Sequence, residues 1–482
     1  MSAAAVSALA AALGDRLCVD PAVLAGLRAD RSGHSSSESP LALVTARSVE
    51  DVQATLRIAT EHGVPVVPRG AGTGLAGGAI ASAGEIVLST LAMNRILHFS
   101  AEDRLAVVEA GIVNGDLNAA LAEQGFWFAP DPASRAISTV GGNIATNAGG
   151  ILCAKYGVTR EAVLGLKVVL ADGRVIETGR RSIKGVTGLD LTALMIGSEG
   201  TLGVIVEATV KVGPLPAGGT ATLSACFPDA ASAARASLAI ATAGLAPAAM
   251  ELLDERSVAA VDRFLGGDAG RGGRQRKGGD PYPELPYADL HDQHHGQGRP
   301  RAWLLVLFDG DDSGVQADRA RKILESTGAD VACTDDSIEG EALLARRRAF
   351  HPALEAMGSV LIEDVAVPRS AFPAMFAEIA AIEERHGVTI ATAAHAGDGN
   401  LHPNFVYEPD GSGDVPPHVW DAAGELFQAA LRLGGTLTGE HGVGILKRRW
   451  LADELGDDQL RLQEGIKALF DPQGILNPGK VF

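Results

Sequence analysis

Cysteine is scarce in this chain and never forms a close pair. No C-x-x-C pattern occurs among the four cysteines, Cys18, Cys153, Cys226 and Cys333. This spacing provides neither a disulfide framework nor the ligands of an iron–sulfur cluster. We therefore expect small buried thiols in a reducing compartment.

Long apolar runs and surplus positive charge are also missing. No apolar run reaches the ~18 residues of a membrane-spanning helix, and the apolar N-terminus lacks the basic stretch of a signal peptide. The chain has 41 Lys and Arg against 59 Asp and Glu, a formal net charge of −18. Because phosphate backbones are held by surplus Lys and Arg, we expect no nucleic-acid partner. These absences indicate a cytoplasmic protein and leave peripheral contact with a membrane open.

Glycine, by contrast, is abundant, and composition shifts suggest how the chain is divided. The run GPLPAGG at 213–219 resembles a linker, and the stretch at about 266–300 mixes Gly, Pro and charged residues with few aliphatic ones. We expect a first domain at 1–216, a second at 217–469 that carries this flexible insertion, and a tail at 470–482. The cluster His291, Asp292, His294 and His295 in the insertion is expected to be solvated rather than to bind a metal.

Local patterns predict mixed helices and strands. Ser48 followed by Asp51 begins a helix and Gly63 ends it, and the strand VPVVP follows at 64–68. A second clear helix is expected at 371–387. Further strands are expected at 85–90, 105–110, 166–173, 201–212 and 301–310. This pattern predicts the α+β class.

Glycine concentrates in three segments, 69–79, 139–150 and 197–205. Gly72–Gly77 satisfies G-x-G-x-x-G, but a turn and a strand follow rather than a helix, so a Rossmann site is not expected. Glycine-rich turns can still expose main-chain N–H groups and let the backbone approach a diphosphate. Polar side chains that would add donors are Thr73, Ser134, Thr139, Asn143 and Asn147. The alternative is that these glycines serve only turns and bulges.

Four motifs together resemble the FAD-binding domain of vanillyl-alcohol-oxidase-type flavoproteins. They are PRGAGTGLAGGA, DPASRAISTVGGNIATNAGG, KYGVTREAVLGLKVVLADG and GSEGTLGVI. The resemblance extends from about Leu41 to Phe482, except in the insertion. It is strongest to the branch that contains D-lactate dehydrogenase (cytochrome type), the FAD-linked subunit of glycolate oxidase and D-2-hydroxyglutarate dehydrogenase. It implies a two-subdomain FAD-binding domain, an α+β substrate cap and a C-terminal tail that returns to the FAD.

The resemblance also implies which residues contact FAD. Some relatives hold flavin covalently through a histidine in the first glycine segment, but 69–74 contains neither His nor Cys. We therefore expect non-covalent FAD. The implied contacts are Arg69, Gly70, Ala71, Gly72, Thr73, Gly74, Pro132, Ser134, Thr139, Gly141, Gly142, Asn143, Asn147, Gly150, Glu199, Gly203, Ile205 and Asn477.

Histidines in the second half suggest a metal site. If 397–400 is the loop of a hairpin, His395 lies opposite His402, with Cβ atoms about 5 Å apart. Two such imidazoles can chelate one ion at roughly 2.0–2.1 Å. Glu440 and His441 are flanked by glycines that can bend the chain and turn both side chains inward. The alternative is a set of unrelated surface histidines.

The family resemblance assigns roles to these residues. It implies that His395, His402 and Glu440 bind a divalent metal, usually zinc, that His441 is the catalytic base, and that Asn404 touches substrate. Among Arg346, Arg347 and Arg348, Arg347 matches the family's substrate arginine. A one-residue shift of the alignment favours Arg346, and a solvated helix face is the third interpretation.

These assignments predict an FAD-linked 2-hydroxy-acid dehydrogenase. His441 would take the hydroxyl proton while hydride passes to flavin. Relatives specific for D-2-hydroxyglutarate carry a lysine where this chain has Ile362, and an apolar residue would leave a second carboxylate unpaired. D-lactate or glycolate is therefore the expected substrate, with D-2-hydroxyglutarate as the alternative.

Two further classes remain, a metal-dependent hydrolase and a non-catalytic flavin-binding electron-transfer subunit. The electron acceptor can be dioxygen, a cytochrome, a quinone or an electron-transfer flavoprotein. A homo-oligomer is left open.

Overall fold

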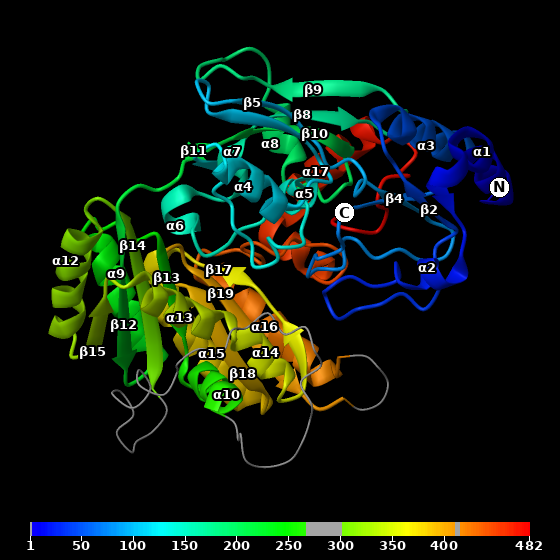
Figure 1. Ribbon diagram of the computed structural model, residues 1–482. Coiled ribbons are helices and arrows are strands. Elements are labelled where there is room, and N and C mark those ends of the chain that lie inside the picture. The colour runs from blue at the N-terminus through cyan, green and yellow to red at the C-terminus, as the bar shows by residue number, and fades with distance from the viewer. Residues whose placement is uncertain (1, 267–300, 410–414) are drawn as a thin grey trace. The chain divides into compact units, whose positions relative to one another are not determined.

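The computed structural model describes residues 2–266, 301–409 and 415–482, which form two compact units (Figure 1). The first unit combines Met1–Leu215 with Leu437–Phe482, and the second is Pro216–Thr436. The first boundary lies within the expected linker at 213–219. The return to the first unit begins at Leu437, whereas the sequence placed it at 470. The insertion expected at about 266–300 lies outside the described residues from 267 onward.

One sheet of the first unit is mainly parallel. Its strand order is β1 (Leu17–Cys18), β2 (Ala42–Thr45), β4 (Ile86–Ser89), β3 (Val66–Arg69). β2, β4 and β3 run parallel and β1 is antiparallel to β2. The core beneath this sheet contains Leu9, Val52, Leu56 and Leu88, all fully buried.

A second sheet in this unit is entirely antiparallel. Its strand order is β5 (Ile96–Ser100), β6 (Leu105–Glu109), β10 (Val204–Lys211), β8 (Val163–Val169), β9 (Val175–Gly179). Its own core contains Val108, Ile144, Val168 and Val210. A two-stranded ribbon pairs β7 (Phe126–Trp127) with β11 (Gly213–Pro214).

Helix α3 of the first unit begins and ends where sequence signals predict. The Asp51 N–H donates to Ser48 Oγ at the start of α3, and Gly63 ends the helix with φ 61°. The helices are α1 (Ser2–Leu13), α2 (Pro21–Ala25), α3 (Val49–His62), α4 (Asn114–Ala122), α5 (Val140–Thr146), α6 (Cys153–Tyr156), α7 (Thr159–Ala162), α8 (Leu191–Met195) and α17 (Leu451–Phe470), with 3₁₀ turns at Gly14–Arg16 and Arg448–Trp450. No helix within the described ranges is long and apolar enough to cross a membrane.

The glycine segments differ in conformation. After Gly72–Gly77 the chain passes through turns into β4, so the prediction that no helix follows is confirmed. The segment 139–150, expected as a loop, instead forms α5 and a following turn. Thr139 Oγ1 accepts the Gly142 N–H and caps this helix. Gly141 permits the close packing, because a Cβ there would lie 2.6 Å from Ala110 Cβ.

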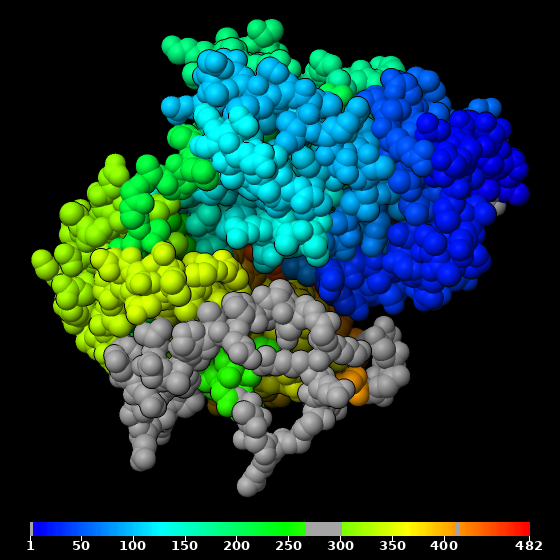
Figure 2. Space-filling model, viewed as in Figure 1, coloured from blue at the N-terminus to red at the C-terminus, as the bar shows by residue number. Residues whose placement is uncertain are grey.

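The C-terminal segment is built into the core of the first unit. Ile475 and Leu476 are 2% and 0% exposed and belong to the core under the parallel sheet. Leu476 also forms a parallel bridge with Val66 of β3. On the face shown in Figure 2, the visible surface of this unit consists mainly of blue and cyan residues from the N-terminal part. The tail is therefore an interior element rather than a loose end.

The second unit is a large antiparallel sheet. Its strand order is β15 (Asp330–Thr334), β12 (Gly219–Phe227), β14 (Ala302–Gly310), β13 (Ala249–Leu253), β18 (Thr389–His395), β19 (Asn400–Tyr407), β16 (Ser359–Ile362), and β17 (Val365–Ala366) also pairs with β19. All neighbouring strands are antiparallel. The strand predicted at 301–310 and the helix predicted at 371–387 are confirmed by β14 and α15.

Helices cover both faces of this sheet. One face packs against α10 (Glu255–Gly266), α13 (Ser337–Arg348) and α14 (Phe350–Glu355). The other packs against α9 (Ala230–Thr242), α12 (Ser313–Ser326), α15 (Phe372–His386) and, through α15, α16 (Pro417–Arg432). The first of these faces carries the candidate site described below.

A buried carboxylate joins the C-terminal segment to the rest of the first unit. Glu199 Oε1 accepts the Val443 N–H at 2.7 Å, and Oε2 accepts the Gly444 N–H at 2.9 Å. Burial raises the pKa of Glu199 to about 7, although these two N–H groups favour the ionised form. Gly442 is needed here, because it has φ 88° and a Cβ would lie 2.9 Å from Glu199 Oε1. Glu199 thus fixes the chain immediately after Glu440 and His441.

The raised pKa predicts a pH-dependent stability. A carboxyl group whose folded-state pKa lies above its ordinary value stabilises the fold fully below pH 4.5 and loses that contribution as the pH rises through 7. The loss is on the order of 1–3 kcal/mol. Thermal unfolding can be followed by circular dichroism at pH 5 and pH 8. The melting temperature should fall more between these two pH values for wild-type protein than for Glu199→Gln. Glu207→Gln, whose carboxylate pairs with Lys167 on the same unit, is the matched control. An equal change of melting temperature with pH in Glu199→Gln and wild type would contradict the raised pKa of Glu199.

Candidate functional site

Strand register in the second unit places three predicted site residues on one face of the sheet, together with Glu251. Glu251 lies opposite His395, His402 opposite Ala393 and Asn404 opposite Ala391. Directly opposed residues share a face, as do residues two apart on one strand. Glu251, His395, His402 and Asn404 therefore share the face that packs against α10, α13 and α14.

The hairpin that carries both histidines exists, but its register differs from the prediction by two residues. His395 lies opposite Asn400, not His402, and the loop is 396–399. The Ala396 N–H donates to Met250 O at 2.7 Å, and the Asp398 and Gly399 N–H groups turn back to His395 O. A shift of two preserves the face of every side chain. The two imidazole rings still meet edge to face, with centroids 5.1 Å apart.

One carboxylate organises this face. Glu251 is completely buried, and its Oε1 lies 2.7 Å from His395 Nδ1 while its Oε2 accepts the Arg347 Nε–H at 2.8 Å. An ionised carboxylate beside a guanidinium only accepts hydrogen bonds, so His395 donates through Nδ1 and carries its lone pair on Nε2. Glu251 thereby fixes both the arginine and the tautomer of the histidine. The sequence analysis missed this residue, although an acidic residue inside the apolar run AMELL was a signal.

The three adjacent arginines have different partners. Arg347 is bound to Glu251, whereas Arg346 pairs with Asp262 at 2.7 Å and stacks over the Trp303 ring at 5.0 Å. Arg348 is more exposed and pairs with Glu341. Arg347 shares the Glu251 carboxylate with His395, which favours it over the alternative Arg346.

His402 also has a carboxylate beside its Nδ1. Asp364 Oδ1 lies 3.8 Å away and is fully buried, a distance beyond hydrogen-bond range. Histidines that bind metals usually present Nε2 to the ion and the other nitrogen to a carboxylate or carbonyl. His395, 6% exposed and hydrogen-bonded to Glu251, matches this pattern, and His402, 8% exposed, has the Asp364 carboxylate nearby.

Asn404 and Ile362 lie opposite each other on β19 and β16. Asn404 is 1% exposed, and its Nδ2 donates to His402 O at 2.7 Å. Its Oδ1 has no hydrogen-bond partner among the residues that the structure describes. A buried acceptor of this kind is suited to a donor on a bound molecule.

Asp254, another residue that the sequence analysis missed, anchors the end of β13. It accepts N–H bonds from Ser257 and Thr392, each at 2.7 Å. Burial raises the pKa of Asp254 to about 6 in spite of these bonds. It thereby holds α10 and β18 at fixed positions beside Glu251.

In the first unit, the first glycine segment is shaped by Arg69. The Arg69 guanidinium donates to Ala79 O and, at 2.9 Å, to Ala29 O. Gly72 has φ 69°, and a Cβ there would lie 2.2 Å from Arg69 Nη2. Arg69 thus closes the segment from inside, while Gly74 faces more open space.

The second and third glycine segments lie close to the first. A Cβ on Gly70 would come within 2.4 Å of Thr139 Oγ1, so these two segments are in contact. Asn477 Nδ2 donates to Gly78 O at 3.0 Å and to Glu199 O at 2.7 Å. Its Oδ1 is buried and lacks a partner within the described parts of the chain. This orphaned acceptor among closely packed glycine segments fits a bound cofactor.

Several predicted FAD contacts already have structural roles. Asn143 bonds Ser138 and Asn114, and Asn147 accepts the Arg160 N–H. Ile205 belongs to the packed antiparallel sheet and Gly203 immediately precedes its strand β10, where a Cβ on Gly203 would lie 2.4 Å from Val168. For these residues, main-chain groups rather than side chains are the ones that remain to contact a ligand.

Glu440 and His441 also belong to the first unit. Their side chains are 17% and 8% exposed, and His441 Nε2 lies 4.0 Å from Glu440 Oε1. Consecutive residues on a straight strand point in opposite directions, so this approach requires the bend that the flanking glycines were expected to supply. Gly442, with φ 88°, provides it.

Comparison with known proteins identifies the family. A model described as "FAD binding domain" matches residues 40–179, and one described as "FAD linked oxidases, C-terminal domain" matches 219–481. Glycolate oxidase subunit GlcD of Bacillus subtilis is 37% identical over 92% of this chain and 89% of its own length. D-lactate dehydrogenase of Anaerostipes hadrus is 35% identical over 92% of this chain and 89% of its own length. D-2-hydroxyglutarate dehydrogenase of Xanthomonas citri is also 35% identical, again over 92% of this chain and 89% of its own length.

Solved structures support the predicted α+β, two-domain fold. p-Cresol methylhydroxylase aligns with TM-score 0.78 at 18% identity, covering 99% of this chain and 96% of that one. 4-Ethylphenol oxidase from Gulosibacter chungangensis aligns with TM-score 0.74 at 20% identity and the same coverage. The family models exclude the hydrolase alternative in favour of flavin chemistry. The chain therefore belongs to the FAD-linked oxidases, as an FAD-dependent oxidoreductase of the glycolate oxidase, D-lactate and D-2-hydroxyglutarate dehydrogenase group.

Proposed function

We propose that this protein oxidises a small 2-hydroxy monocarboxylate, D-lactate or glycolate, to the 2-oxo acid. The observation that carries the proposal is the buried Glu251 carboxylate between His395 and Arg347. It places a cation suited to a carboxylate and an imidazole suited to a metal on one side of the same sheet. The relatives named for glycolate, D-lactate and D-2-hydroxyglutarate support the substrate class.

Substrate binding would rest mainly on Arg347. With its Nε–H engaged by Glu251, the two terminal nitrogens of Arg347 can grip the substrate carboxylate as a fork. Asn404 would accept a hydrogen bond from the substrate through the buried Oδ1 that lacks a partner among the described residues. These contacts fix the α-carbon relative to the catalytic groups.

Proton removal is assigned to His441. It would accept the hydroxyl proton of the substrate as the α-carbon loses hydride, so that the carbon–oxygen double bond forms without a charged oxygen. Non-covalent FAD, when bound, accepts the hydride, and the residues proposed to hold it are the glycine segments with Asn477. Glu199 would help to position His441 through the N–H groups of Val443 and Gly444.

A divalent ion, zinc by preference, is proposed to be bound by His395, His402 and Glu440. The carboxylates beside both histidine Nδ1 atoms support this donor set. Such an ion would supply Lewis-acid polarisation of the substrate hydroxyl. The remaining steps of the proposal, carboxylate binding by Arg347 and proton uptake by His441, are carried out by protein side chains.

The preference for a monocarboxylate rests on Ile362. It lies directly opposite Asn404, beside the proposed substrate position. A second carboxylate buried against an isoleucine would lose its hydration without gaining a cation, at a cost of several kcal/mol. Electrons are proposed to leave to a cytochrome, a quinone or an electron-transfer flavoprotein, and the protein is proposed to act in the cytoplasm, at most at the periphery of a membrane.

The test is anaerobic reduction of the purified, FAD-loaded protein. D-Lactate or glycolate should bleach the flavin band at about 450 nm, and D-2-hydroxyglutarate in a parallel cuvette should not. His441→Gln should keep its yellow colour and slow bleaching by at least about 100-fold, because the base is lost. Arg347→Met should raise KM more than it lowers kcat.

His386→Gln is the control, since this histidine pairs with Glu425 on the α15–α16 side of the sheet. Bleaching by the dicarboxylate alone would keep the mechanism and overturn the substrate assignment. A yellow protein that no hydroxy acid reduces would instead favour the electron-transfer subunit.

Glu251→Gln provides an independent test of the organising carboxylate. The neutral amide cannot satisfy both the guanidinium and the imidazole, so metal affinity and kcat should each fall by roughly 10–100-fold. Metal content after dialysis and the pH profile of flavin reduction are the measurements. Glu341→Gln, whose carboxylate pairs with Arg348 of the same helix, is the matched control. Unchanged metal content with an unchanged pH profile would refute the role of Glu251.

A further inference from the structure

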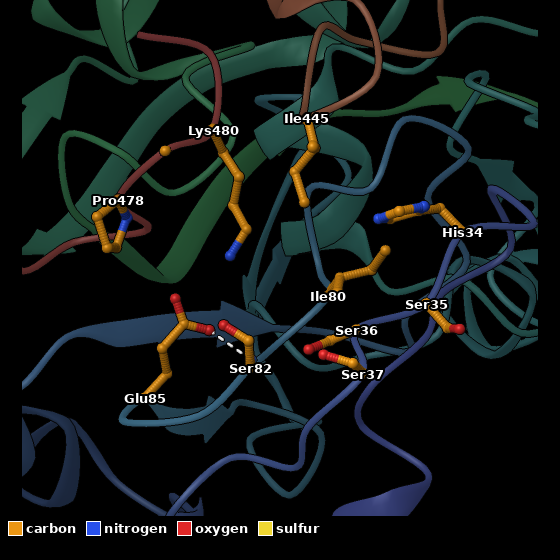
Figure 3. Close-up of a pocket in the computed structure, with 11 residues that line it drawn as sticks. His34, Ser35, Ser36, Ser37, Ile80, Ser82, Glu85, Ile445, Pro478 and Lys480 are labelled. Atoms are coloured by element: carbon orange, nitrogen blue, oxygen red, sulfur yellow. Dashed lines mark hydrogen bonds between the residues drawn. The ribbon is translucent and has the colours of Figure 1, made fainter. Parts of the chain in front are cut away.

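The first unit contains a pocket of about 450 Å³ that none of the preceding assignments uses (Figure 3). Its walls come from the segment 34–37, from residues around β4 and from the C-terminal tail. None of its lining residues belongs to the sets proposed above for FAD, metal or substrate. The volume lies within the usual range of small-molecule sites.

A buried cation lines this pocket. Lys480 is 4% exposed, and its Nζ has no hydrogen-bond or ion-pair partner among the described residues. Figure 3 shows its side chain extending from the tail toward Glu85. Burial lowers the pKa of Lys480, while Glu85 and Asp30 act in the opposite direction. A buried ammonium without a direct partner is costly unless something supplies acceptors.

The tail holds Lys480 in place. The Asn477 N–H donates to Val66 O at 2.8 Å, and the Val481 N–H donates to Gly444 O at 2.9 Å. Val481 has φ 64°, a conformation that a β-branched residue rarely adopts. Such strain persists only where surrounding contacts enforce it. The backbone on both sides of Lys480 is therefore fixed, and its side chain begins inside the pocket.

The remaining lining suits a polar ligand with one negative group. Ser37 and Ser82 contribute hydroxyls, and Ile80 and Ile445 form an apolar wall. Glu85 also lines the pocket, where its Oε2 accepts the Ser82 N–H at 2.7 Å. This bond fixes the carboxylate, which favours the charge on Lys480 yet would repel a second anion.

We infer that this pocket binds a small oxyanion, a phosphate or a carboxylate group, through the Lys480 ammonium and the adjacent serine hydroxyls. Lysine is a common point-charge ligand for phosphate. The hydroxyls can rotate to donate to the remaining oxygens. Glu85 weakens binding by repulsion and so limits occupancy to anions at high concentration.

Binding of inorganic phosphate and of acetate to the FAD-loaded protein tests the inference, by isothermal titration calorimetry at low ionic strength. Lys480→Met should weaken binding of the preferred anion at least tenfold. Lys211→Met, which removes an exposed charge from β10 of the same unit, should not. Glu85→Gln should tighten binding several-fold, because the amide oxygen can still accept the Ser82 N–H while the repulsion is gone.

Each outcome of these measurements either supports or overturns the inference. Stronger binding of phosphate or of acetate identifies the class of ligand, and binding of neither overturns the inference. Equal binding by Lys480→Met and wild type also overturns it, as does binding seen only after FAD is removed, because the pocket would then belong to the cofactor. If Lys480→Met fails to fold, Glu85→Gln carries the test, and an affinity equal to that of wild type would reject the site.

Discussion

The arrangement of the second unit depends on the burial of the Glu251 carboxylate. A carboxylate that is removed completely from water must be paired and hydrogen-bonded, or the fold pays its desolvation. Glu251 meets this requirement with a guanidinium on one oxygen and an imidazole on the other. The same constraint that stabilises the sheet therefore orients Arg347 and His395, so the site is preorganised by the fold rather than assembled on binding.

The first unit uses a related arrangement with a different electrostatic balance. Glu199 is also buried, at 8% exposed, but it accepts hydrogen bonds from the neutral N–H groups of Val443 and Gly444. Neutral dipoles compensate an ionised group less than cations do, which explains why burial dominates and raises the pKa of Glu199 to about 7. The result is a positioned backbone beside His441.

The sequence predicted the parts of this structure that depend on local interactions. The capped helix α3, the central strands and the hairpin between His395 and His402 all follow from neighbouring residues. The hairpin register was wrong by two because the Ala396 N–H bonds to Met250 on β13, a distant segment. Glu251 was missed for the same reason, since it lies 144 residues from its partner His395. Helix α5 was missed because glycine-rich sequence disfavours helix. In the structure, capping by Thr139 and close packing of Gly141 on Ala110 stabilise the helix in spite of its glycines.

The contacts of Glu251 are separate from the position of Ile362, and this separation suggests how one fold could serve several 2-hydroxy acids. Glu251, His395 and Arg347 lie at the junction of β13, β18 and α13, where any change exposes a buried charge. Ile362 lies on the edge strand β16, paired with Asn404, and its side chain takes part in none of those bonds. Under the proposed function, a substitution at that edge would change which distal group is tolerated and would leave the buried carboxylate satisfied. Substrate preference would then change at low structural cost, while the core would hold the Glu251 contacts unchanged.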